Sequence, residues 1–180
     1  MDRHADPQGG FFQSAEAGEP GGIRLQPTGD GALPSANSVA LRVLLRLSRI
    51  GDRPAYWKAA EDPLRRHSAM VRRHPQGFTF LLAGLDFYLG PSSEVVLAGR
   101  AGGEDTAALA RALRQAFLPR AVFLLRPTGQ EGLAILRLAP FARDYGEGPD
   151  GQARAFVCRN YSCRLPTGDA REMLALLAEP

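Results

Sequence analysis

The residues whose types and spacing could do chemistry lie in two short stretches of the chain. The first is DGALPSANS (30–38), in which Asp30, Ser35, Asn37 and Ser38 stand together ahead of an apolar run. Ser and Asn are preferred N-cap residues, and a helix needs only one such side chain. A helix start also offers unpaired backbone N–H groups, which favour a nearby carboxylate such as that of Asp30. The remaining polar side chains therefore serve either a turn or a polar ligand site, and the residues alone leave both open.

The second stretch is AFVCRNYSCRLP (155–166), which holds Cys158 and Cys163. Two cysteines five positions apart could form a disulfide, bind a metal with distant ligands, or pack in a core. A structural zinc site needs four ligands, and neither a second cysteine pair nor a suitably spaced histidine pair is present, so we expect no metal and no cofactor. A redox CxxC would have two intervening residues instead of four. For a cytoplasmic chain we expect reduced thiols, and we keep both cysteines as redox candidates.

A glycine-rich stretch, GRAGGEDTAALA (99–110), follows an expected strand and enters an expected helix, as a dinucleotide-binding loop does. Its glycines lack the GxGxxG order, and the carboxylates of Glu104 and Asp105 would repel a pyrophosphate. We interpret it as a short loop whose acids favour the helix dipole.

Charge and hydropathy argue against two classes of partner, nucleic acids and membranes. The chain has 22 Lys and Arg against 19 Asp and Glu, a net charge of +3, with the arginines scattered among acids. The densest cluster (Arg65, Arg66, Arg72 and Arg73) fits a solvated helix face better than a nucleic-acid site. No run approaches the ~20 apolar residues that span a bilayer, and the N-terminus has no signal-type apolar region. We therefore expect no nucleic acid, no membrane and a cytoplasmic location.

Two groups of elements must position these residues. Residues 1–36 have little periodicity and are expected to be irregular, which is unusual for the start of an independent domain. Three helices are then predicted over 37–51, 53–75 and 76–90, with Pro63 kinking or dividing the second. Their short connections predict antiparallel hairpins.

The periodicity changes after residue 91. Buried strands are predicted over 93–99 and 120–127 with a helix over 103–117 between them, which is a βαβ unit with parallel strands. A further strand is expected over 153–160 and a terminal helix over 168–179. The chain is thus predicted to be mixed α/β, with a helical segment at 1–91 and a small α/β module at 92–180.

Four stretches occur in the order seen in one family: DPQGGFF (6–12), DGALPSANSVA (30–40), SEVVLAG (93–99) and AFVCRNYSCRLPT (155–167). The chain resembles the C-terminal part of the spermatogenesis-associated, thioredoxin-domain-containing (YyaL-type) proteins. That family pairs a thioredoxin-like domain with a six-hairpin (α/α)6 barrel similar to glycosidases and sugar epimerases. The thioredoxin-like domain and most hairpins have no counterpart here, and Ala36 stands where the family has a glycine.

The resemblance implies a fragment that carries the end of the (α/α)6 barrel, followed by the α/β module. It implies a sugar-like ligand, with Asp30 as the catalytic residue and Ser35 and Asn37 as substrate-binding residues. The implied partner is the upstream part of the same protein or a complementary chain, without which the chain is expected to be inactive. Two alternatives stay open: a redox or protein-interaction module that uses Cys158 and Cys163, and a purely structural segment that completes the barrel.

Overall fold

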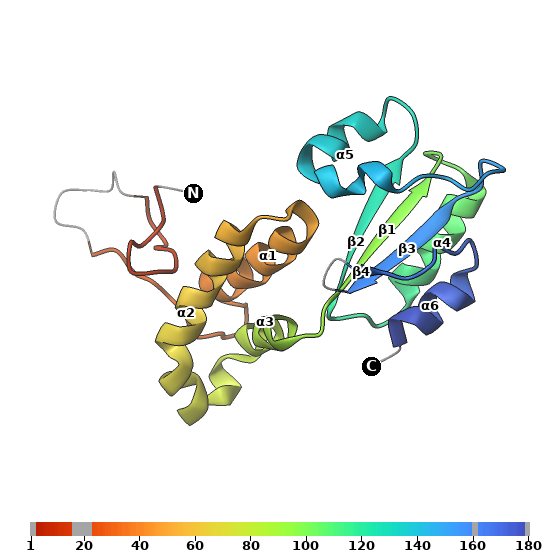
Figure 1. Ribbon diagram of the computed structural model, residues 1–180. Helices are drawn as coiled ribbons and strands as arrows, with labels where there is room; N and C mark the ends of the chain where they lie inside the picture. The colour runs from red at the N-terminus through yellow and green to blue at the C-terminus, as the bar shows by residue number, and fades with distance from the viewer. Residues whose placement is uncertain (1–2, 16–22, 160–161, 179–180) are drawn as a thin grey trace. The chain divides into compact units, whose positions relative to one another are not determined.

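The chain is mixed α/β and divides into two compact units, shown in the computed structural model of Figure 1. The structure describes residues 3–15, 23–159 and 162–178. The first unit comprises residues 1–48 and 53–89, and the second comprises 49–52 and 90–180. Over the described residues the elements are six α-helices and a four-stranded sheet. The units meet in sequence between Leu89 and Gly90, beside the boundary expected from the change in periodicity.

The first unit is built from three helices that follow an irregular segment. They are α1 (Ala36–Gly51), of which residues 36–48 belong to this unit, α2 (Pro54–Arg73) and α3 (Thr79–Leu89), with the short 3-10 helix η1 (Pro75–Gly77) before α3. Apolar residues from each helix are buried, among them Leu41, Leu44, Leu45, Leu64, Leu81 and Phe87. Gly84 lies against Leu41, since a Cβ at Gly84 would come within 2.9 Å of Leu41 Cδ2. The absence of a side chain there lets α3 approach α1 closely.

Of the two effects expected of Pro63, kinking or dividing the second helical run, division is wrong. One helix, α2, continues from Pro54 to Arg73 with Pro63 buried inside it. A proline withholds one backbone N–H and crowds one carbonyl, at a cost of about 3 kcal/mol. The neighbouring Ala60 and Leu64 are buried on the same helix, and their packing outweighs that local cost.

The second unit is a four-stranded sheet in the order β2-β1-β3-β4. Its strands are β1 (Ser93–Gly99), β2 (Ala121–Pro127), β3 (Arg154–Arg159) and β4 (Ser162–Cys163). β1 pairs with β2 in parallel and with β3 antiparallel. The helix α4 (Glu104–Gln115) connects the two parallel strands, so the predicted βαβ unit is confirmed.

Helices cover both faces of this sheet (Figure 1). On one face Val95 and Leu97 pack with residues of α4 and α6 (Ala170–Ala178). On the other face Val96 packs with the segment that holds α5 (Gly132–Leu138) and the 3-10 helix η2 (Pro140–Asp144). Every residue of β1 is buried, which explains its nearly continuous apolar sequence. Alternate residues of β1 therefore belong to different layers of the core.

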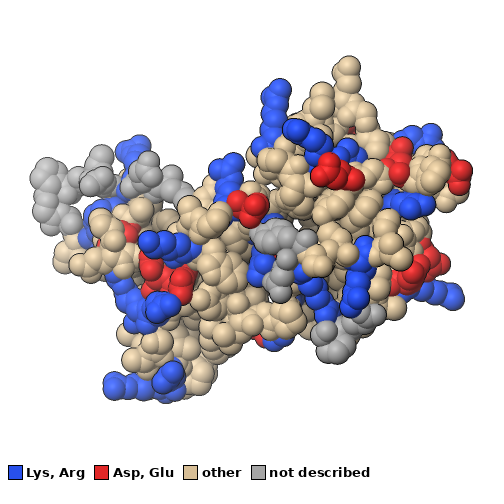
Figure 2. All heavy atoms as spheres, in the orientation of Figure 1, with Lys and Arg blue, Asp and Glu red and all other residues tan. Residues whose placement is uncertain are grey.

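Positive and negative side chains are intermixed on the face shown in Figure 2. Within the cluster of four arginines, Arg65 lies 2.5 Å from Glu61 and Arg66 lies 3.3 Å from Asp6. In the part of the chain that the structure describes, no helix is both long and apolar enough to cross a bilayer.

Replacing Leu109 by alanine should destabilise the second unit by about 2–4 kcal/mol, because Leu109 is 2% exposed and fills the space between α4 and the sheet. Urea unfolding followed by circular dichroism would measure the loss. The matched control is Leu125→Ala on β2, where the side chain is 42% exposed and the expected loss is below about 1 kcal/mol. Equal losses for the two variants would contradict the assigned core.

Candidate functional site

The polar stretch 30–38 forms the entrance to α1, and Ser35 is its N-cap. The Ser35 hydroxyl accepts a hydrogen bond from the Ser38 backbone N–H at 3.1 Å, and the Ser35 carbonyl accepts one from Val39 N–H at 3.0 Å. The same hydroxyl lies 3.1 Å from the Thr28 carbonyl and 2.9 Å from the Ser38 hydroxyl. One side chain thus satisfies an orphan N–H group of the helix and also holds the preceding loop.

Asp30 binds backbone N–H groups at two places. One carboxylate oxygen accepts from Ser35 N–H at 2.9 Å, and the other accepts from Phe80 N–H at 2.8 Å and Leu81 N–H at 3.1 Å. Burial disfavours the charged form of Asp30, but hydrogen bonds from Ser35, Ser38, Leu81 and Phe80 outweigh it and lower its pKa. Because Phe80 and Leu81 are in the first turn of α3, the carboxylate caps that helix from a distant loop.

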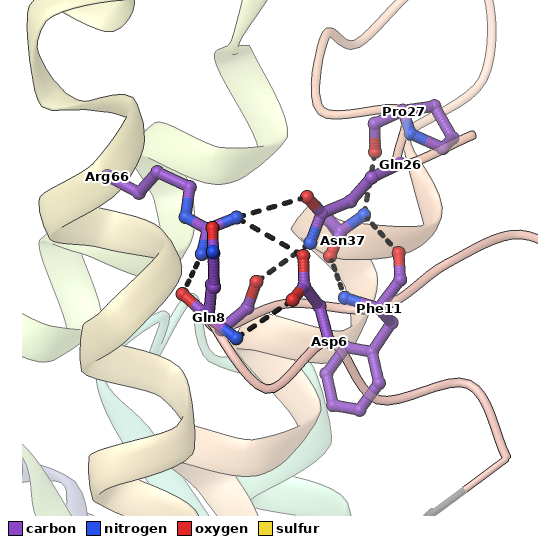
Figure 3. A network of polar contacts seen from close by, with 8 residues as sticks. Asp6, Gln8, Phe11, Gln26, Pro27, Asn37 and Arg66 are labelled. Atoms are coloured by element: carbon purple, nitrogen blue, oxygen red, sulfur yellow. Dashed lines mark hydrogen bonds and ion pairs between the residues drawn. The ribbon is translucent and has the colours of Figure 1, made fainter. Parts of the chain in front are cut away.

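Asn37 is 3% exposed and bonds to two other segments (Figure 3). Its side-chain oxygen accepts from Phe11 N–H at 2.8 Å. Its amide donates to the Phe11 carbonyl at 2.9 Å and to the Pro27 carbonyl at 2.8 Å. The Asn37 side chain therefore pairs with Phe11 as a neighbouring strand would, and joins residues 11 and 27 to the first turn of α1.

A second set of polar contacts, also in Figure 3, holds the N-terminal segment against α2. Arg66 forms an ion pair with Asp6 at 3.3 Å and donates to the Gln8 carbonyl. Gln26 donates to the Gly9 carbonyl at 2.8 Å. This network could not be predicted from the sequence, since its members are as many as 60 positions apart.

The structure thus brings Asp30, Ser35 and Asn37 together at one helix entrance, where they bond to backbone groups of the chain. The contacts are those of residues that fix a loop in place. The catalytic role of Asp30 and the substrate contacts of Ser35 and Asn37 stay predictions.

The two cysteines form a disulfide, so the expectation of reduced thiols is wrong. β3 and β4 are antiparallel, and their register places Cys158 directly opposite Cys163. Side chains at directly opposed positions lie on the same face of a sheet and close to each other. The spacing of five residues, which argued against a CxxC motif, is what a tight hairpin between two short strands requires.

Tyr145 lies beside this disulfide. Its hydroxyl is 2.9 Å from Cys163 Sγ and 3.9 Å from Cys158 Sγ. Its ring stacks on Phe156, with centroids 4.7 Å apart. Burial raises the pKa of Tyr145, and the charges of Asp144 and Glu94 raise it further, so the hydroxyl keeps its proton at neutral pH.

Glu94 is a second group near the disulfide that the sequence analysis did not single out. It stands opposite Cys158 on the neighbouring strand, its side chain is 3% exposed, and within the second unit it pairs with Arg49 at 3.5 Å. A charged residue is rarely so deeply buried unless it is paired. In the sequence, Glu94 could be noticed as a carboxylate within the mostly apolar run SEVVLAG, at a position that shares a face of the strand with Val96.

An open pocket of about 370 Å³ borders the same hairpin, and its lining residues are Val157, Arg159, Ser162, Cys163, Arg164 and Leu176. Arg159 is held in place there, since its Nε donates to Ser93 Oγ at 3.3 Å and a terminal nitrogen donates to the Leu177 carbonyl at 3.4 Å. Among the described residues, no three His, Cys, Asp or Glu side chains gather as a metal site would require.

The chain is similar to three mammalian proteins named spermatogenesis-associated protein 20. It is 32% identical to the human protein over 174 residues, which is 96% of the chain and 22% of that protein. The identity is 29% for both the mouse and the rat proteins, over 96% and 94% of the chain. No family model matches the chain, and neither does any solved structure. The chain spans about a fifth of the length of these curated relatives.

Replacing Asp30 by asparagine should lower the free energy of unfolding of the first unit by about 2 kcal/mol at pH 7, because it removes a charge that accepts three backbone hydrogen bonds. Since folding lowers the pKa of Asp30, its contribution is full above the unfolded value of about 3.9 and is lost as the pH falls through the folded value. The free energies of unfolding of the parent chain and of Asp30→Asn should therefore become equal below about pH 4.

Thermal unfolding from pH 3 to pH 7 would measure this difference. The exposed Asp150, in the loop of the second unit, provides the control variant Asp150→Asn, which should match the parent chain throughout. A difference between parent and Asp30→Asn that does not change with pH would contradict the role of the charge.

Proposed function

We propose that the chain acts as part of a longer carbohydrate-binding protein that joins a thioredoxin-like domain to a six-hairpin, glycosidase-like barrel. The support is the family resemblance of the four sequence stretches and the similarity to spermatogenesis-associated protein 20 over nearly the whole chain. In this proposal the first unit supplies helical hairpins at the end of an (α/α)6 barrel, and the α/β unit follows them in the chain.

The observation that carries the proposal is an apolar stripe on the outer side of α1. Val39, Val43 and Leu47 follow each other at intervals of four residues and are 40–46% exposed. The same helix buries Leu41, Leu44 and Leu45 in the core of the unit. A helix that is apolar on two faces is typical of an interior helix with neighbours on both sides. The helices of the upstream part of the protein, or of a complementary chain, would cover this stripe.

In this proposal, the polar side chains at the start of α1 contribute to the binding of a sugar ligand. A sugar presents several hydroxyl groups, which need donors and acceptors in fixed positions. Asp30, Ser35 and Asn37 hold the loop 27–35 at the start of α1. In the proposed barrel, the loops at this end of the inner helices would line the ligand cavity. The lowered pKa of Asp30 suits a fixed negative charge in that role, because a carboxylate kept ionised by three backbone N–H groups is a weak base and holds no proton to donate at neutral pH.

If the stripe is a covered surface in the longer protein, the chain by itself should self-associate. We expect its apparent mass in sedimentation-velocity runs to increase with concentration. Val43→Glu places a charge in the centre of the stripe and should keep the chain monomeric. The control is Ser68→Glu on the exposed side of α2. A parent chain that stays monomeric at high concentration would contradict the proposed covering partner.

The ligand class can be tested on the longer protein, that is, the chain with the upstream part that the proposal requires, by saturation-transfer NMR with maltose, cellobiose and N-acetylglucosamine. We expect saturation of at least one sugar and a loss of that signal in Ser35→Ala. The variant removes the cap hydroxyl at a cost of about 1 kcal/mol, so the chain should stay folded. Ser68→Ala is the matched control. Absence of saturation for all three sugars in the longer parent protein would count against the carbohydrate function.

A further inference from the structure

We propose that the outer side of α1 is a docking surface for an acidic amphipathic helix, which sets carboxylates beside an apolar stripe. This surface, the α1 docking face, comprises Val39, Arg42, Val43, Arg46 and Leu47. It rests on the proposed function in one respect, since the acidic helix is the partner that would cover the stripe.

Every charged side chain of α1 is positive. The helix reads ANSVALRVLLRLSRIG, with arginines at positions 42, 46 and 49 and neither Asp nor Glu. Arg49 is paired with Glu94 inside the second unit. On α2, by contrast, Arg65 has Glu61 one helical turn away. The part of α1 that belongs to the first unit therefore presents positive charge that its own sequence does not balance.

Arg42 and Arg46 lie along one flank of the apolar stripe. They are four positions apart, so they are neighbours on the helix surface. The guanidinium carbon of Arg42 is 5.1 Å from the ring centroid of Phe80, and that of Arg46 is 5.9 Å from the ring centroid of Phe87. Both rings belong to α3, so α3 holds the two guanidinium groups at the edge of the stripe.

The two guanidinium groups repel each other. Burial lowers the pKa of Arg46, and the positive charge of Arg42 lowers it further. No carboxylate of the described residues lies within ion-pair distance of Arg42. Like charges four positions apart destabilise a helix. Carboxylates of a partner, placed beside this flank, would replace the repulsion by attraction.

The stripe has the form that another helix fits. Val39, Val43 and Leu47 follow each other at intervals of four residues, and such a row forms a ridge that packs into a groove of a neighbouring helix. Each of the three side chains is 40–46% exposed, so the ridge is open to a partner. A helix with an apolar face toward the ridge and Asp or Glu toward the arginines matches the surface in both shape and charge.

Two other occupants match the α1 docking face less well. A second copy of the chain would bring the arginines of two α1 helices together, so its association through the stripe is opposed by charge. A membrane surface usually takes up a helix that offers Trp, Phe or Leu along its apolar face. Here the stripe holds two valines and one leucine, and the arginines lie over rings of α3.

The test uses the full chain and two fluorescent helical peptides of about 18 residues, long enough to lie along the whole of α1. Both peptides have the same leucine stripe, flanked by Glu in one and by Gln in its twin. Fluorescence anisotropy measures the two dissociation constants. At low salt we expect the Glu peptide to bind about fivefold more tightly than the Gln twin, as two exposed ion pairs provide. The preference should disappear as the salt concentration rises.

Variants of the arginines separate charge from stickiness. Arg42→Gln should reduce the preference to about twofold, because it removes one of the two pairs. Arg42→Glu combined with Arg46→Glu should reverse it, so that a twin flanked by Lys binds more tightly than the Glu peptide. The matched control is Arg72→Gln on the exposed side of α2, which should leave the preference unchanged. Since the readout is a ratio of two dissociation constants, a loss of stability that weakens both peptides equally leaves it unchanged.

Three results would overturn the proposal. Equal dissociation constants for the Glu and Gln peptides at low salt would exclude the acidic partner, even where the chain self-associates through the stripe. Binding of neither peptide would exclude a helix as the occupant. Co-sedimentation with vesicles of phosphatidylcholine and phosphatidylserine, by a chain that binds neither peptide, would assign the α1 docking face to a membrane. The proposed function fails on other results, namely a parent chain that stays monomeric or a longer protein that binds no sugar.

Discussion

Backbone N–H and C=O groups outside regular structure need hydrogen-bond partners, and this requirement governs the first unit. Residues 3–15 and 23–35 contain only one isolated β-bridge, between Ala5 and Phe11. Side chains from the helices and from the segment itself supply the missing partners: Asn37 binds Phe11 and Pro27, and Arg66 binds Gln8. Asp30 does the reverse: this loop residue accepts hydrogen bonds from backbone N–H groups in the first turn of α3. The helices and the irregular segment thus complete each other's hydrogen bonds.

The same requirement accounts for the polar contacts at the entrance to α1. At the entrance to α1 the polar atoms of Asp30, Ser35 and Asn37 are bonded to the backbone, so any action on a ligand depends on the loop that they hold. Beside the disulfide the arrangement differs. Tyr145 contacts sulfur atoms, and Arg159 and Arg164 line an open pocket. In the second unit, polar groups therefore contact the disulfide and an open pocket as well as the backbone.

Much of the fold could be predicted because it depends on local apolar periodicity. The strand at 93–99, the helix after it and the strand at 120–127 are visible as patterns, and the structure pairs those strands in parallel. What could not be predicted depends on contacts between distant residues. Asn37 and Phe11 are 26 positions apart, and the partners of Asp30 lie 50 and 51 positions away. The continuity of α2 through Pro63 likewise depends on packing, which periodicity does not encode.

The expected cytoplasmic location favours reduced thiols, whereas the local sequence pattern around the two cysteines favours the bond that the structure shows. The antiparallel strands pair Arg159 with Ser162 and Cys158 with Cys163, and this fixes the register. With that register, Cys158 and Cys163 are opposed whatever the redox state of their surroundings, so the hairpin prepares the pair for a bond. Glu94 lies on the strand next to Cys158, where a carboxylate would weaken a purely apolar core. Its side chain is paired with Arg49. A sheet selected only for stability would have an apolar residue at that position. The buried charge next to the sulfur pair is a reason to look for chemistry there.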